Sequence, residues 1–294
     1  MNWESLVKTM NDREKNKVLP GVLYLVATPI GNLADTSERA IKVLSEVDLI
    51  AAEDTRNSLK FLSHFGISKP LVSYFEHNKR QRGPEIVSSL KEGKAWALIT
   101  DAGTPAISDP GEDLVRLCVQ EGITVTSIPG ACAVINALAL SALSTRRFLF
   151  EGFLEGKPKE RREYLETMKR EQRTMVFYES PHDLCDTLVL MGDVFGENRS
   201  LALCRELTKF NEEIMRVSFK EAIDYYKEHS PRGEYVLVVE GAKDCQEENG
   251  LNALPIDDHV AYYVSLGLSK MDAIKQTARD RGVPKGTIYK ALIE

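Results

Sequence analysis

The chain has 294 residues, which is too long for one ordinary hydrophobic core and fits two compact units with an addition. Hydrophobic residues make up 43% and charged residues 28% of it, values typical of a soluble globular protein. No apolar run reaches the roughly 20 residues that cross a bilayer. Residues 1–20 mix charged with single apolar positions and lack the apolar core of a signal peptide, which predicts a helical extension in a cytoplasmic protein with no membrane segment.

The cysteines and histidines are dispersed along the chain. The five cysteines are odd in number and never form a C-x-x-C pair, which argues against a disulfide framework and a structural zinc site. The five histidines share no i, i+4 spacing. We therefore expect no metal site.

The first half alternates short apolar runs with helix-period segments, and predicts an α/β domain over residues 21–146. Such alternation with short loops is typical of a mostly parallel sheet covered by helices on both faces. The expected strands are residues 22–27, 49–52, 71–73, 95–100 and 124–128. The expected helices between them are residues 36–45, 58–65, 83–91 and 111–121. A further helix over residues 131–143 is almost wholly apolar, so we expect it to be buried.

The second half predicts another α/β domain over residues 147–242, followed by a linker and a helical tail. Its expected strands are residues 148–153, 174–178, 201–204, 214–217 and 235–240, and its expected helices are 159–170 and 183–191. Residues 243–256 are acidic and rich in turn formers, as in a linker. In the tail, residues 257–294, the spacing of Ala278, Gly282 and Ile288 is that of a helix-turn-helix unit.

The net charge of −6 is unusual for a protein that binds nucleic acid. Local cationic clusters can nevertheless bind phosphate. The stretch from Lys157 to Arg173 carries seven cations and four anions, and includes Arg161 and Arg162. We expect these two arginines to contact RNA phosphates, although a solvated helix face is the alternative interpretation.

Three loops that follow strands carry the unusual residues. They read ATPIGNLADTS, TDAGTPAISDPG and IPGACAV, and ligands of open α/β sheets bind beyond such strand ends. Prolines in these loops remove backbone donors, and Asp101 and Asp109 place negative charge where a phosphate would bind. There is no G-x-G-x-x-G and no Walker lysine. The loops therefore favour a cofactor with a positive centre, such as the sulfonium of S-adenosylmethionine, unless they are only tight structural turns.

Five segments together resemble the ribosomal RNA small subunit methyltransferase I family, part of the tetrapyrrole methylase superfamily. They are LYLVATPIGNLADTSERA, DLIAAEDTRNSLKFLSHFGI, SYFEHN, ITDAGTPAISDPG and VTSIPGACAVINALALSAL. The resemblance runs from about Gly21 to Ala242. It implies two α/β domains of tetrapyrrole methylase type with the cofactor cleft between them, plus a small C-terminal helical domain. It also implies S-adenosylmethionine as cofactor, 2′-O-methylation of a cytidine ribose in the decoding region of 16S rRNA, either as free RNA or in the small ribosomal subunit, and a homodimer.

The resemblance also implies roles for individual residues. Cys132 departs from the small polar residues that are frequent at its position in the superfamily. The segments MVFYESPH and LALCRELTKFNEE resemble parts of the family that face the cleft and the substrate. The implied substrate side comprises Asn32, Glu53, Asp54, Arg56 and Arg205. The implied cofactor contacts are Pro29, Gly31, Asp101, Ala102, Gly103, Thr104, Pro105, Gly130, Ala131 and, from the second domain, Tyr178.

Methyl transfer to a ribose hydroxyl needs a group that orients the hydroxyl and accepts its proton. Glu53 and Asp54 end the second expected strand, where strand alternation sends their side chains to opposite faces. Among the candidates Glu53, Asp54 and Asp101, we expect Asp54 to be the catalytic carboxylate, with Arg56 keeping it ionised and Asn32 as an orienting hydrogen-bond partner. Glu53 is the alternative catalytic carboxylate, and Asp101 is more readily explained by bonds to its own loop or to the cofactor. In the alternative interpretation Arg56 only pairs with Asp54 and caps the next helix, and Asn32 is a turn or helix-cap residue.

Two other functions are compatible with parts of the sequence. A methylase of a tetrapyrrole or another small molecule would have the same fold, but the tail and the cationic stretch favour a large anionic substrate. A ligand-sensing DNA-binding regulator would use the helix-turn-helix, but an acidic chain with one weak reading helix argues against it.

Overall fold

The computed structural model describes residues 17–243, 251 and 254–292. Most of the predicted extension over residues 1–20 and of the predicted linker over residues 243–256 lies outside them, and residues 17–20 are not helical. The chain divides into two compact units. One comprises the chain to Thr167 together with Thr174–Glu240, and contains both sheets. The other comprises Met168–Arg173 and the chain from Gly241 onward.

The first sheet is entirely parallel, as the alternating pattern predicted, and has the order β3-β2-β4-β1-β5. Its strands are β1 (Val22–Val26), β2 (Leu49–Ala52), β3 (Leu71–Ser73), β4 (Trp96–Ile99) and β5 (Thr124–Ile128). The intervening helices are η1 (Leu33–Asp35), α2 (Glu38–Glu46), α3 (Thr55–His64), α4 (Lys79–Lys91) and α5 (Gly111–Gln120). Helix α3 begins three residues earlier than expected because Asp54 caps it, accepting a hydrogen bond from the backbone of Arg56.

Both faces of this sheet are covered by helices. Alternate strand residues such as Val26 and Ile50 pack with α2 and α3 on one face. The residues between them, such as Leu23 and Leu98, pack with α4 and α5 on the other. The central strands β1, β2 and β4 are largely buried, whereas the edge strands β3 and β5 are partly exposed, and the loops extend from the carboxyl ends of these parallel strands.

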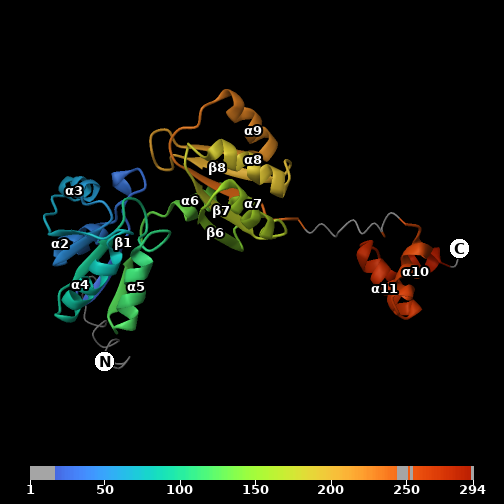
Figure 1. Ribbon diagram of the computed structural model, residues 1–294, viewed down its shortest axis with the longest axis horizontal. Helices are drawn as coiled ribbons and strands as arrows, with labels where there is room; N and C mark the ends of the chain where they lie inside the picture. Colours follow the sequence, from blue (N-terminus) through green and yellow to red (C-terminus); the bar gives the residue numbers. More distant parts are fainter. Residues whose placement is uncertain (1–16, 244–250, 252–253, 293–294) are drawn as a thin grey trace. The chain divides into compact units, whose positions relative to one another are not determined.

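The second sheet is mixed, with the order β6-β7-β10-β8-β9. Figure 1 labels β6, β7 and β8 of this sheet, near helices α7 and α8. Only β6 and β7 are parallel, and the other pairs are antiparallel. Its strands are β6 (Phe148–Phe153), β7 (Thr174–Glu179), β8 (Ser200–Arg205), β9 (Glu213–Ser218) and β10 (Tyr235–Val239). Its helices are α7 (Pro158–Thr167), α8 (Leu184–Phe195) and α9 (Phe219–Glu228). The sequence analysis missed α9, although Ser218 and Glu221 form a capping box that marks its start.

Helix α6 (Ala133–Leu140) packs against the second sheet, although it lies within the segment expected to form the first domain. Val134, Ala137 and Leu138 are buried there against β7, β8 and β10. The expectation that this apolar helix is buried holds for one face only, because Ile135 remains 53% exposed and Leu140 37% exposed. One face of α6 is thus core, and the other is an apolar surface.

The tail is helical, as predicted, and consists of α10 (Ile256–Ser265), α11 (Lys270–Asp280) and α12 (Lys285–Ala291). Ala278 and Ile288 belong to its small core, and Gly282 makes the turn between α11 and α12 with a φ of +63°. A glycine suits this turn because other residues are strained at positive φ. None of the described helices has the length and apolar character needed to span a membrane.

Candidate active site

Loops from both sheets line one cleft of about 530 Å³, a volume suited to a small organic cofactor. The first sheet contributes the loops after β1, β2, β4 and β5, and the second contributes the ends of β6, β7 and β8 and the start of β10. From the first half the lining residues are Ile30, Glu53, Thr100, Asp101, Ala102, Gly103, Thr104, Ile107, Ser108, Asp109, Cys132 and Ala133. From the second half they are Phe153, Tyr178, Glu179, Ser180, Pro181, Cys204, Glu206, Leu207, Lys209, Glu234, Tyr235 and Val236.

Hydrogen bonds tie the three glycine loops together. Thr28 exchanges two backbone hydrogen bonds with Gly103, of 2.9 and 3.1 Å, so the loops after β1 and β4 are clamped. The Thr104 hydroxyl donates to the carbonyl oxygen of Ala131 at 3.0 Å, which joins the loop after β4 to the loop after β5. The cleft floor is therefore organised before any ligand binds.

The glycines of these loops are required by close contacts within the protein. Gly103 has a φ of +86°, and a Cβ atom there would lie 3.3 Å from Ile30. A Cβ atom at Gly130 would lie 2.7 Å from the Cβ of Ala27, and one at Gly31 would lie 2.3 Å from the Cγ of Lys209. Loop packing therefore explains Gly31 and Gly130 without any ligand.

The cleft is acidic. Glu53, Asp101, Asp109, Glu179, Glu206 and Glu234 line it, whereas Lys209 is the one lysine or arginine among the lining residues that the structure describes. Lys209 itself is paired with Glu206 at 2.8 Å and with Glu234 at 3.0 Å. Burial raises the pKa of Glu179. An acidic cleft of this kind favours a positively charged ligand over a polyphosphate.

Asp109 presents an unpaired carboxylate oxygen. Its Oδ1 accepts a hydrogen bond from the backbone of Gly111 at 2.7 Å. Its Oδ2 is buried and has no hydrogen-bond partner among the described residues. Ala106 and Ser108 just before it have φ values of +67° and +63°, so the loop that carries Asp109 is held in an uncommon conformation. A buried acceptor without a donor indicates a place for a ligand's N–H or O–H group.

Tyr178 forms an apolar wall of the cleft. Its ring packs edge-on against Phe150 and contacts Phe153, with ring centroids 5.0 and 5.4 Å away. Burial raises the pKa of Tyr178 to about 12, so its hydroxyl stays protonated at neutral pH. The ring therefore offers a neutral surface next to the acidic groups.

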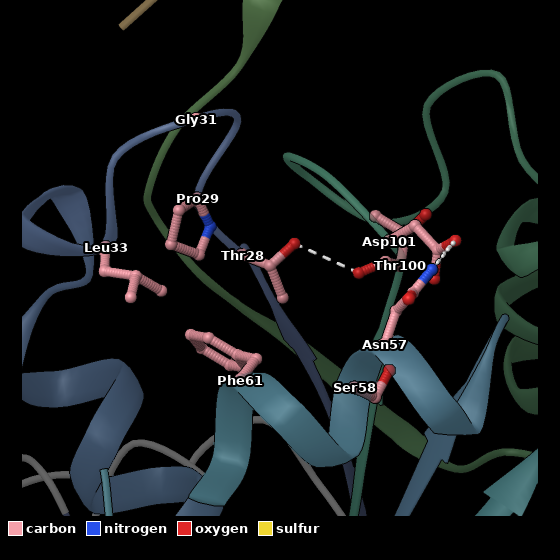
Figure 2. Close-up of a pocket in the computed structure, with 9 residues that line it drawn as sticks. All are labelled: Thr28, Pro29, Gly31, Leu33, Asn57, Ser58, Phe61, Thr100 and Asp101. Carbon is pink, nitrogen blue, oxygen red and sulfur yellow. Dashed lines mark hydrogen bonds between the residues drawn. The ribbon is translucent and has the colours of Figure 1, made fainter. Parts of the chain in front are cut away.

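A second, smaller cavity of about 200 Å³ lies beside the cleft (Figure 2). It is bounded by the loop after β1, by the first two turns of α3 and by the end of β4. Its lining residues are Thr28, Pro29, Gly31, Leu33, Asn57, Ser58, Phe61, Thr100 and Asp101. Thr100 and Asp101 line both cavities. The Asp101 carboxylate accepts hydrogen bonds from the Asn57 amide at 3.3 Å and from the Asp54 backbone at 3.2 Å.

Glu53 and Asp54 are in different surroundings. Glu53 lines the cleft, and its Oε2 accepts a hydrogen bond from the Thr100 hydroxyl at 2.9 Å. Asp54 lines neither cavity and caps α3. Its two oxygens also accept hydrogen bonds from the Arg56 guanidinium at 3.2 and 2.8 Å, and this contact lowers the pKa of Asp54 to about 2. The geometry is thus that of the alternative in which Arg56 pairs with a helix cap.

The other predicted site residues are distributed as follows. Pro29 and Gly31 line the small cavity, and Ala102, Gly103 and Thr104 line the cleft. The Asn32 side chain accepts from the backbone of Ala34 at 3.0 Å, so it caps η1 and lines neither cavity. Pro105, Gly130 and Ala131 also lie outside the two linings.

The three arginines expected to bind substrate all have acidic partners. Arg162 lies 2.7 Å from Asp193, and Arg161 lies 3.7 Å from Asp183. Arg205 is paired with Glu213 at 2.9 Å. Sequence reasoning missed Phe153, Glu179 and Lys209 as lining residues, although Lys209 lies in a segment that resembled the family. Among residues 17–243, 251 and 254–292, no group of three His, Cys, Asp or Glu side chains is arranged to hold a metal ion.

Comparisons with known proteins agree with this arrangement. The family model described as Tetrapyrrole (Corrin/Porphyrin) Methylases matches residues 22–223. Uroporphyrin-III C-methyltransferase from Thermus thermophilus, solved with S-adenosylhomocysteine, is similar with a TM-score of 0.54 and 14% identity over 74% of this chain and 96% of that one. A conserved hypothetical protein from Aeropyrum pernix has a TM-score of 0.59 and 14% identity over 90% of this chain and 91% of that one. At these identities the structural likeness shows the fold.

Fold, strand-end loops and family match together place the chain in the tetrapyrrole methylase family, so the protein is a methyltransferase. Proteins named ribosomal RNA small subunit methyltransferase I are far more similar in sequence. The protein of Halalkalibacterium halodurans is 51% identical over 92% of this chain and 93% of its own length. That of Synechocystis sp. is 43% identical over 93% and 98%, and that of Bacillus subtilis is 46% identical over 92% and 94%, of this chain and of their own lengths. Within the wider family, the chain belongs to the ribosomal RNA small subunit methyltransferase I family.

Proposed function

We propose that the protein transfers the methyl group of S-adenosylmethionine to the ribose 2′-oxygen of a cytidine in the decoding region of 16S rRNA. The names of its relatives supply the rRNA of the small subunit as substrate. The observation that carries the chemistry is the Glu53 carboxylate, which lines the cofactor cleft with one oxygen held by Thr100. A ribose hydroxyl is a weak nucleophile, so it needs such an acceptor for its proton.

The cleft residues fit S-adenosylmethionine. The acidic lining suits the positive charge of the sulfonium and of the amino group. The buried Asp109 Oδ2 lacks a partner among the described residues and suits a ligand N–H or O–H donor. When bound, the cofactor supplies a methyl group activated by its positively charged sulfur.

The residues that would hold the cofactor come from both halves. Asp101, Ala102, Gly103 and Thr104 follow β4 and form one wall. Tyr178 forms the facing wall with its neutral ring. Pro29 and Gly31 after β1, together with Pro105, Gly130 and Ala131, support these walls through loop packing. Their proposed role is to position the loops.

Glu53 is the carboxylate that we propose to prepare the hydroxyl, in place of Asp54, which the sequence favoured. Glu53 reaches the cleft, whereas both oxygens of Asp54 are occupied by Arg56. A carboxylate whose pKa is about 2 is also a poor acceptor for a proton at neutral pH. Asp54 then positions Arg56, and the 87% exposed Arg56 side chain is available to an RNA phosphate.

The proposed RNA contacts of Arg161, Arg162 and Arg205 require exchange of partners. Each guanidinium now faces a carboxylate. The pair of Arg162 is exposed, and exposed ion pairs are weak and easily exchanged, whereas Arg161 and Arg205 are partly buried. Asn32 lies at the tip of the loop after β1, where it is exposed and caps η1. We retain it as an orienting residue for the RNA.

The proposed assembly is a homodimer in the cytoplasm. Ile135 and Leu140 of α6, with Phe148 at the start of β6, leave exposed apolar side chains that a second copy would cover. Sedimentation of the purified protein should give twice the chain mass of 32.9 kDa. A monomer at all concentrations would contradict this assembly.

The decisive experiment offers three acceptors to the purified protein with labelled S-adenosylmethionine: small ribosomal subunits, free 16S rRNA and a tetrapyrrole precursor. We expect label in RNA, recovered as 2′-O-methylcytidine after nuclease digestion and mass spectrometry. Label in the tetrapyrrole alone would refute the proposal. Label in RNA on a base would refute the ribose assignment.

A further inference from the structure

The small cavity next to Asp101 is too small for the cofactor that the cleft accommodates. Its volume of about 200 Å³ is well below that of the cleft, about 530 Å³. A cavity of about 150 Å³ is enough to hold a benzene molecule. The small cavity therefore matches a single aromatic ring with its substituents.

Its walls are apolar on one side and polar on the other (Figure 2). Pro29, Leu33 and Phe61 form the apolar side. The Phe61 ring is fixed, because it packs on the core of the first domain and edge-on against Phe65 at 5.5 Å. A planar ring with polar edges would lie against this side and direct its polar groups to the other.

The polar side offers acceptors in Asp101 and Asn57, and the Ser58 hydroxyl there can donate or accept. Asp101 is a carboxylate whose two oxygens provide about four acceptor sites, of which the Asp54 backbone and the Asn57 amide each use one. Because the Asn57 amide nitrogen donates to Asp101, its oxygen is the end that accepts. The Thr28 hydroxyl donates to the Thr100 carbonyl and is already used.

This pattern distinguishes between the pyrimidines. Cytosine carries an exocyclic amine, which is a donor, where uracil carries an oxygen, which is an acceptor. The exocyclic amine of cytosine can donate to the oxygens of Asp101 and Asn57, whereas the exocyclic oxygen of uracil would face the Asp101 carboxylate. Carboxylates are established partners for the cytosine amine in nucleic-acid recognition.

The position of the cavity links it to the reaction. Thr100 and Asp101 line both cavities, and Glu53 is bonded to Thr100 on the cleft side. The two cavities thus share the wall that Thr100 and Asp101 form, so that a nucleotide with its base in the small cavity would have its ribose next to the cleft. Enzymes that modify nucleic acids commonly take the target nucleotide out of its stack into such a pocket.

We infer that the cavity between the Thr28–Leu33 loop and α3 holds the base of the acceptor cytidine, and that Asn57 with Asp101 selects cytosine over uracil. This inference rests on the proposed function and adds the recognition of the base. Asn57 then becomes a specificity-determining residue that does not touch the cofactor.

The test uses the full-length protein, saturating S-adenosylmethionine and small subunits that carry cytidine or uridine at the modified position. The wild type should methylate cytidine with the higher kcat/KM. Asn57→Ala should reduce this preference about tenfold, the effect of removing one base-edge interaction. Ser63→Ala is the matched control, because Ser63 is exposed on the same helix and does not line the cavity. Unchanged selectivity in active Asn57→Ala would overturn the inference.

A second variant fills the cavity. Leu33 is 42% exposed, so Leu33→Trp should fold normally and place an indole where the base is expected. We expect cytidine methylation to fall at least about tenfold, by the same estimate for a base contact, while calorimetry still shows binding of S-adenosylmethionine. Retained methylation, or complete loss of cofactor binding, in Leu33→Trp would overturn the inference. If the wild type leaves no 2′-O-methylcytidine in the RNA that carries cytidine, the proposed function itself fails.

Discussion

Exchange of the two carboxylates at the end of β2 provides the sharpest test of the site. Glu53→Gln removes the proton acceptor but keeps an oxygen that can bond to the Thr100 hydroxyl, which now lies 2.9 Å away. Asp54→Asn keeps the helix cap, because asparagine and aspartate cap helices about equally well. Both changes are nearly isosteric, so neither should unfold the protein.

The expected magnitudes follow from these surroundings. A positioned general base contributes about 10²–10⁴-fold to the rate, so Glu53→Gln should slow transfer by at least about a hundredfold, or about 2.7 kcal/mol in activation free energy. Asp54→Asn removes an ionic interaction with Arg56, whose side chain is 87% exposed, and should change the rate less than about threefold.

The assay is single-turnover methylation with saturating protein, cofactor and small subunits, which isolates transfer from product release. Calorimetry with S-adenosylmethionine controls for binding. A large reduction in rate for Asp54→Asn together with a normal rate for Glu53→Gln would refute the geometric argument and restore the assignment made from sequence. Normal rates in both would mean that positioning alone drives the transfer.

Three further outcomes are expected. Gly103→Val should weaken S-adenosylmethionine binding at least about tenfold, because a side chain at this position is strained at a φ of +86° and faces Ile30. The control Gly122→Ala, at a φ of +69° in open space, should leave the affinity unchanged. Equal calorimetric affinities of the two variants would contradict the loop assignment. Replacing Arg161 and Arg162 with glutamine should weaken RNA binding. It should also reduce the slope of log binding constant against log salt concentration by about 0.7–0.9 for each phosphate that is no longer neutralised. An unchanged slope would mean that the two arginines belong to a solvated helix face and do not contact RNA. Because burial raises the pKa of Glu179, this carboxyl group binds a proton more tightly in the folded protein than in the unfolded chain. Its contribution to the free energy of unfolding is therefore favourable below the ordinary pKa of glutamate and is lost as the pH rises. Glu179→Gln should therefore raise Tm at pH 8 but not near pH 4, and the opposite trend in calorimetric scans would refute the sign.

The first sheet was predictable because its signals are local and repeated. Each strand is a short apolar run bounded by turn residues, and a parallel sheet follows from the helices between them. The loops after β1, β4 and β5 were also recognisable, since glycine, proline and aspartate cluster where the strands end. Proline and aspartate there excluded a phosphate cradle, and the structure shows an acidic cleft at the same place.

The side-chain roles were harder to predict because they depend on distant partners. Strand alternation indicated that only one of Glu53 and Asp54 faces the cleft, but the choice depends on Thr100, which lies 47 positions from Glu53 in sequence. In the same way, the acidic partners of Arg161 and Arg162 lie on or beside α8. The apolar composition of α6 could not show that it packs on one face only. No periodic pattern in a single sequence encodes these contacts.

The shared wall of the two cavities has a consequence for the order of events. Asp101 belongs to both linings, so an occupant of either cavity alters the field and the orientation that the other experiences. Two ligands that contact one carboxylate have linked affinities, and the linkage is equal in both directions. Titrations of S-adenosylmethionine with and without RNA should therefore give different dissociation constants. The ratio of these two constants should equal the ratio of the dissociation constants of RNA measured with and without cofactor.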